Sequence, residues 1–172
     1  MPIYGSHGME PLGSRWAVLA KGIVAGFVAT VALSVVMVIV QLAGLLPQLD
    51  LITLLTVAAG VPGMAWAGWS LHFLIGTLAW GILFVYLRPL MPGKGRVTQA
   101  VWFGALAWLL MMVAFMPAAG AGLFGQGLDG LSVAIATLVL HLFYGWVLGA
   151  TFSAMTRDEA LAASTPLDDS RR

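Results

Sequence analysis

Four runs of apolar residues constrain this chain most, because each is long enough to cross a lipid bilayer as a helix. They lie at about residues 22–46, 65–87, 98–116 and 131–155. A helix rises about 1.5 Å per residue, so roughly 20 residues cross a hydrocarbon layer of about 30 Å. With 60% hydrophobic and 9% charged residues, the composition is that of a membrane protein. We therefore predict an all-α, integral membrane four-helix bundle.

The segments on either side of these runs are more polar. We predict an N-terminal lead at residues 1–20, a four-span transmembrane domain at residues 21–156 and a polar tail at residues 157–172. The first run begins too far along the chain to be a removable signal peptide. Between the first two spans, residues 51–59 are apolar but too short to cross, so we predict an interfacial helix with Asp50 as its N-cap.

Basic residues are confined to alternate connections, which predicts the orientation of the bundle. The eight are Arg15, Lys21, Arg88, Lys94, Arg96, Arg157, Arg171 and Arg172. The other two connections contain Asp50 and Asp129 but neither Lys nor Arg. By the positive-inside rule, both termini and the middle connection are cytoplasmic. A net charge of +1 offers no basic patch for nucleic acid, so the expected partners are the lipid bilayer and other membrane subunits or a second copy.

A histidine-containing segment occurs twice in the apolar runs. Leu71-His72-Phe73-Leu74-Ile75-Gly76 returns 69 residues later as Leu140-His141-Leu142-Phe143-Tyr144-Gly145. Each histidine lies 16 residues before a basic residue that marks the inner end of its span, Arg88 or Arg157, so the two have the same predicted depth. A histidine is costly to expose to lipid, and both are therefore candidates for function.

The two halves of the chain resemble each other in a second place. The outer connections both open with Gly-Leu and end with Leu-Asp, at Asp50 and at Asp129. We therefore predict two tandem helical hairpins that form a parallel pseudo-repeat about an axis along the membrane normal.

A haem is the cofactor that this pattern favours. In an up-down bundle the second and fourth spans lie on a diagonal of about 11 to 14 Å, which is too long for two imidazoles to share a small ion. A haem iron between the rings suits that separation. We predict haem b with His72 and His141 as axial ligands, and with Gly76 and Gly145 leaving room for the macrocycle. The chain would then be a non-enzymatic, haem-carrying or accessory subunit of a membrane electron-transfer assembly.

Three other interpretations remain open. The histidines can be structural, bonded to Ser70, Thr137, Tyr144 or a backbone carbonyl. Counting 16 residues from Lys21 and Arg96 reaches Met37 and Met112, which with the histidines would form a copper site. A small transporter is the third.

Motifs for catalysis are lacking in the sequence. It contains no nucleophile with a base at motif spacing, no paired carboxylates within an apolar run and no phosphate-binding loop. This favours a protein that is not an enzyme.

Three segments resemble a known family. They are Lys21-Gly22-Ile23-Val24-Ala25-Gly26-Phe27, Leu71-His72-Phe73-Leu74-Ile75-Gly76-Thr77 and His141-Leu142-Phe143-Tyr144-Gly145. Over most of residues 21–155 the chain is similar to a family of small bacterial inner-membrane proteins, the domain of unknown function 6789. The resemblance implies a four-helix membrane fold in the bacterial inner membrane and assigns no activity, substrate or cofactor.

Overall fold

The computed structural model describes residues 12–164, and the side chains of residues 15–157. In this part of the chain the structure is helical, with short loops and without β-strands. The elements are α1 (Leu12–Leu42), α2 (Leu51–Ala58), α3 (Ala65–Leu74), a π-helix (Ile75–Ala79), α4 (Trp80–Leu87), a 3-10 turn (Arg88–Leu90), α5 (Arg96–Leu110), a second π-helix (Met111–Phe115), α6 (Met116–Ala118), a second 3-10 turn (Leu123–Gly125) and α7 (Leu131–Ser164).

The described part of the chain contains four helical stretches that are long and apolar enough to cross a membrane, as the sequence predicted. They are Arg15–Leu42, Ala65–Leu90, Arg96–Ala118 and Leu131–Arg157. We call Ala65–Leu90 the second span and Arg96–Ala118 the third span, because each continues through a π-helix without a break. The first span is α1 and the fourth is α7.

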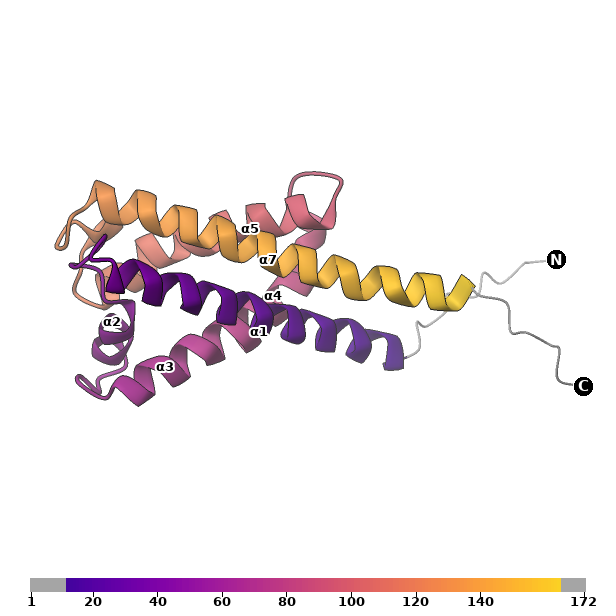
Figure 1. The fold of residues 1–172 in the computed structure, drawn as a ribbon, viewed down its shortest axis with the longest axis horizontal. Coiled ribbons are helices and arrows are strands. Elements are labelled where there is room, and N and C mark those ends of the chain that lie inside the picture. The colour runs from indigo at the N-terminus through magenta and orange to yellow at the C-terminus, as the bar shows by residue number, and fades with distance from the viewer. Residues whose placement is uncertain (1–11, 165–172) are drawn as a thin grey trace, which may run out of the picture.

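The four spans form a bundle with a defined neighbour order. α1 packs against the second span and against α7, and α5 packs against α7. α4 contacts α5 at the end where the second and third spans are joined. The second span and α7 therefore stand at opposite corners, and α1 begins at the same end of the bundle at which α7 finishes (Figure 1).

Glycines set the closest approaches between neighbouring spans. A β-carbon on Gly26 of α1 would lie 2.9 Å from the carbonyl oxygen of Gly76 in the second span. In the other half of the chain, a β-carbon on Gly104 would meet the backbone carbonyl of His141, and one on Gly145 would meet that of Ala100. Close helix approach of this kind stabilises membrane bundles, because packing rather than hydrophobicity drives association in lipid.

The core at the end where the described termini lie is aromatic. The ring centroids of Phe84 and Phe103 are 5.5 Å apart, and those of Phe84 and Phe152 are also 5.5 Å apart. All three side chains are almost fully buried. This cluster joins the second, third and fourth spans at one level of the bundle.

The short helix α2 closes the opposite end. Its N-cap is Asp50, as predicted, whose carboxylate accepts the Thr53 backbone N–H at 3.0 Å and the Thr53 hydroxyl at 2.6 Å. α2 packs on α3, where a β-carbon on Gly68 would lie 2.6 Å from the Ile52 carbonyl oxygen. α2 thus lies against the second span at the end that the aromatic cluster does not fill.

The first and last helices are longer than the apolar runs that predicted their spans. Residues 12–20 belong to α1 and residues 157–164 belong to α7. Both stretches contain Ala and Leu, which are strong helix formers and favour continuation of the helix. The remaining residues of the predicted lead and tail lie outside the described part of the chain.

Substituting alanine at the close-approach glycines will destabilise the bundle. Gly104→Ala or Gly145→Ala places a methyl group against a backbone carbonyl of the facing helix, and overpacking of this kind costs about 1 to 3 kcal/mol. Gly95→Ala is the matched control, because its β-carbon would have an ordinary 3.6 Å contact with Thr98 Oγ1. Reversible unfolding in detergent measures the difference, and equal stability of all three variants would contradict the packing described here.

Candidate functional site

A cavity lies in the half of the bundle nearer α2. Its volume is about 260 Å³. Four polar side chains border it, namely Thr30, His72, His141 and Tyr144. The rest of the lining consists of Leu33, Leu51, Leu55, Ile75, Gly76, Trp80, Ala107, Leu110, Met111, Ala114 and Phe115. The predicted pair of histidines is thus brought to one shared space, with mainly apolar walls.

Both π-helices lie at this cavity, which the sequence did not predict. Ile75 and Gly76 come from the first π-helix, and Met111, Ala114 and Phe115 come from the second. A π-turn is a wider turn that is rare in proteins and frequent at functional sites. The cavity is therefore bordered by widened turns on two of the four spans.

The first π-helix frees a carbonyl that the fourth span uses. The Trp80 N–H donates to the Ile75 carbonyl, one residue earlier than the Gly76 carbonyl of a regular α-helix. The Tyr144 hydroxyl instead donates to the Gly76 carbonyl oxygen at 2.7 Å. This bond is buried and links the two histidine-containing segments directly.

His72 is fixed by a serine of the first span. Its Nε2 lies 3.0 Å from Ser34 Oγ, and its side chain is 7% exposed. Ser34 donates its one hydroxyl proton to the Thr30 carbonyl at 2.8 Å, so Ser34 Oγ accepts from His72. The proton of the neutral His72 ring is therefore on Nε2, and its Nδ1 has a free lone pair.

His141 is fixed within its own helix. Its Nδ1 lies 2.8 Å from the Thr137 carbonyl oxygen, which can only accept a proton, so Nδ1 is the donor. The lone pair of the neutral ring is on Nε2. His141 also borders a second cavity of about 50 Å³ that reaches Gln41 and Asp50 beside α2. His141 therefore lines both cavities.

Gly76 and Gly145, which were predicted to leave room for a macrocycle, both lie at close contacts between spans. Gly76 borders the cavity, but the place of its β-carbon is filled by the Thr30 side chain. The missing side chain of Gly145 faces the backbone of Ala100 in α5. Both glycines serve close packing between spans, as glycines commonly do in membrane bundles.

The predicted copper ligands do not all line one cavity. Met37 borders the smaller cavity with His141, whereas Met112 is fully buried in the apolar cluster with Met116 and Val133. Its neighbour Met111 borders both cavities. Within the described side chains there is no group of three or more His, Cys, Asp or Glu residues that could hold a metal ion.

Sequence reasoning missed three residues of the site, namely Ser34, Tyr144 in its bond to Gly76, and Met111. A signal existed for the first. Gly22, Gly26, Thr30 and Ser34 recur every four residues on α1, which places them on one face toward a neighbouring helix.

Over the residues that the structure describes, the chain is all-helical, with four helices long and apolar enough to span a membrane, and it contains a cavity lined by two histidines. A family of unknown function (DUF6789) matches residues 16–163, and the chain belongs to that family. We find no match to the chain among curated proteins and none among solved structures.

A double-mutant cycle tests the bond between α1 and the second span. Ser34→Ala and His72→Phe each remove one partner, and buried side-chain bonds in membrane bundles couple by about 0.6 kcal/mol on average and about 1.7 kcal/mol at most. We expect a coupling free energy of unfolding in this range. Ser70→Ala, which removes an exposed bond to the Trp66 carbonyl, should show none with His72→Phe, and a zero value for Ser34 would contradict the assignment.

Proposed function

We propose that this protein binds a small, mainly apolar molecule in the central cavity, between its two histidines. The single observation that carries the proposal is the arrangement of those rings. Each is fixed through one nitrogen by a bond within the protein, and both border the same apolar space. A preformed apolar cavity with a few convergent polar groups is the usual form of a small-molecule site.

The shape of the bundle supports entry from the bilayer. The second and third spans meet through α4 and α5, and α3 diverges from α5 toward the end that carries α2 (Figure 1). The rim of the cavity on the third span includes Leu110, which is 44% exposed, and the exposed Ala114. A molecule dissolved in the hydrocarbon layer would reach the cavity between these two spans.

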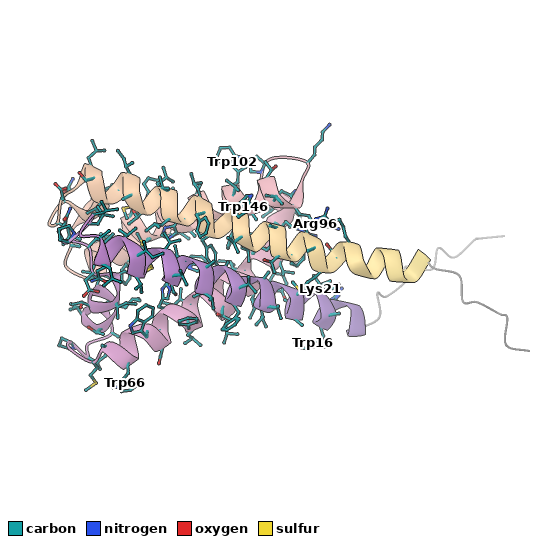
Figure 2. All side chains as sticks on the ribbon, in the orientation of Figure 1. Trp16, Lys21, Trp66, Arg96, Trp102 and Trp146 are labelled. Carbon is teal, nitrogen blue, oxygen red and sulfur yellow. The ribbon has the colours of Figure 1, made fainter. Side chains whose placement is uncertain are left out.

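The charges support a definite orientation in a bacterial inner membrane. Lys21 and Arg96 lie toward the end of the bundle where α1 begins and α7 finishes, and Trp66 lies at the opposite end (Figure 2). Trp66 is 72% exposed, which suits an aromatic side chain at a membrane interface. The proposed topology has both termini in the cytoplasm and α2 on the other side.

The glycine contacts support the predicted pseudo-repeat. Gly26 approaches the second span at Gly76, and Gly104 approaches α7 at His141 and Gly145. In each half, a glycine of the preceding span therefore makes a close contact with the histidine-containing segment. We propose that the two halves are related hairpins.

Haem b stays a prediction, and the arrangement of these residues does not favour it. The cavity of about 260 Å³ is smaller than the roughly 300 to 1,000 Å³ typical of sites for drug-sized molecules. The Nε2 of His72 is already bonded to Ser34, and the space beside Gly76 is filled by Thr30. The predicted role in an electron-transfer assembly depended mainly on haem, so this arrangement does not favour that role either.

A purely structural or assembly role is the second candidate. It rests on the same bonds, because each histidine has a partner inside the protein without any ligand. This role predicts that filling the cavity changes nothing except packing. The two candidates therefore differ in what the cavity contains.

Filling the cavity will remove its occupant. Ala107 is 1% exposed and lines the cavity, so Ala107→Phe should displace a bound molecule; Ala114→Phe does so at the rim with less strain. Extraction of protein purified from native membranes, followed by mass spectrometry, should find a small molecule in the wild type at several times the level of either variant. Ala154→Phe, on an exposed face of α7, is the matched control.

An absorption spectrum of the same samples separates the interpretations. A Soret band that disappears in His72→Ala and in His141→Ala would return haem as the occupant. Equal extracts from wild type, cavity-filled variants and control would contradict ligand binding and favour the structural role.

A further inference from the structure

We propose that the occupant of the cavity is an aromatic ring that carries two hydroxyl groups, a membrane-dissolved quinol in its reduced form. This inference rests on the proposed function and names the class of ligand. The inference depends on the hydrogen bonds around the cavity. The hydroxyl groups there already donate hydrogen bonds to backbone carbonyls, and each of the two imidazoles keeps one nitrogen lone pair without a partner within the described part of the chain.

The hydroxyl groups at the cavity have no proton to offer a ligand. Thr30 Oγ1 donates to the Gly26 carbonyl at 2.7 Å, and the Tyr144 hydroxyl donates to the Gly76 carbonyl at 2.7 Å. Ser34, behind His72, donates to the Thr30 carbonyl. Each hydroxyl has a single proton, so these groups can act toward a ligand only as acceptors.

The imidazoles are acceptors as well. Nδ1 of His72 and Nε2 of His141 are the lone-pair nitrogens, and neither has a hydrogen-bond partner among the described residues. In that same part of the chain, the one fully buried side-chain polar atom without a partner is Thr77 Oγ1. Neither lone-pair nitrogen is among the fully buried atoms without a partner, and the cavity that both histidines line is the central one.

Two acceptors from opposite corners of the bundle require two donors on opposite sides of the ligand. His72 belongs to the second span and His141 to α7, which stand diagonally. A cation could also satisfy lone pairs, but no Asp or Glu among the described residues lines the cavity, and an uncompensated charge is costly in apolar surroundings. Two neutral hydroxyl groups in para positions fit this pattern.

The volume and the walls suit one substituted ring. An apolar cavity of about 150 Å³ is large enough for benzene, and this one is about 260 Å³. Trp80, Phe115 and several leucines supply apolar contact. The oxidised form has the same shape, but its carbonyl oxygens are acceptors and would face the lone pairs of both rings without a proton between them.

Three compounds of matched shape test this inference on the full-length protein in lipid nanodiscs. Tetramethylhydroquinone has two donors, tetramethyl-1,4-benzoquinone has two acceptors, and 1,2,4,5-tetramethylbenzene has neither. Calorimetry without oxygen should give a dissociation constant for the hydroquinone at least about 10-fold lower than for the other two, a difference of about 1.4 kcal/mol. His141→Phe and His72→Phe should each reduce that preference severalfold, and His7→Ala, in the N-terminal lead, should keep it.

The possible results distinguish the two proposals. Equal affinity for all three compounds, or tighter binding of the quinone, overturns the quinol inference and leaves the cavity as a ligand site. No binding of any of the three compounds also overturns the quinol inference, and the comparison of extracts from wild type and cavity-filled variants then decides the proposed function. If His72→Phe does not fold, His141→Phe alone decides, because the bond of His141 lies within one helix. If a quinol with an isoprenoid tail fails to displace the hydroquinone, the ligand is not a quinol dissolved in the membrane.

Discussion

The hydrogen bond from Tyr144 to the carbonyl of Gly76 holds together the features on which the site depends. Lipid offers no partner for a backbone carbonyl, so a π-turn in a membrane span must find one inside the protein. Tyr144 supplies that partner from the diagonally opposite span, at 2.7 Å. The widened turn, the two histidine-containing segments and the cavity between them are thereby fixed in one arrangement.

Packing divides the bundle into a closed half and an open half. At the end that carries most of the basic side chains, Gly22 meets Gly81, Gly149 meets the start of α5, and three phenylalanines fill the centre. Toward the other end, α3 diverges from α5, and α2 packs against α3 (Figure 1). The cavity lies in this open half.

Much of the fold could be predicted from sequence, because hydropathy alone locates four spans and the twofold histidine pattern locates the site. The histidines do share a cavity. The π-turns could not be predicted, since Ile75–Ala79 and Met111–Phe115 have no common residue pattern that separates them from α-helix. The packing role of Gly76 and Gly145 could not be predicted either. The sequence does not distinguish a glycine beside a void from one whose missing side chain lets Thr30 or Ala100 approach closely. Hydropathy did not predict that α1 begins ahead of its apolar run or that α7 continues beyond its own, because a helix can continue where hydropathy falls.

Nitrogen NMR of the histidine rings tests the central claim most directly, because it reports which nitrogen of each ring carries the proton. With ¹⁵N-labelled histidine in lipid nanodiscs, and His72→Phe and His141→Phe to assign the signals, we expect the Nε2–H tautomer for His72 and the Nδ1–H tautomer for His141. Adding tetramethylhydroquinone should shift the unprotonated nitrogen of both rings as it accepts a hydrogen bond. Opposite tautomers, or a shift in neither ring, would contradict a cavity built from two acceptors.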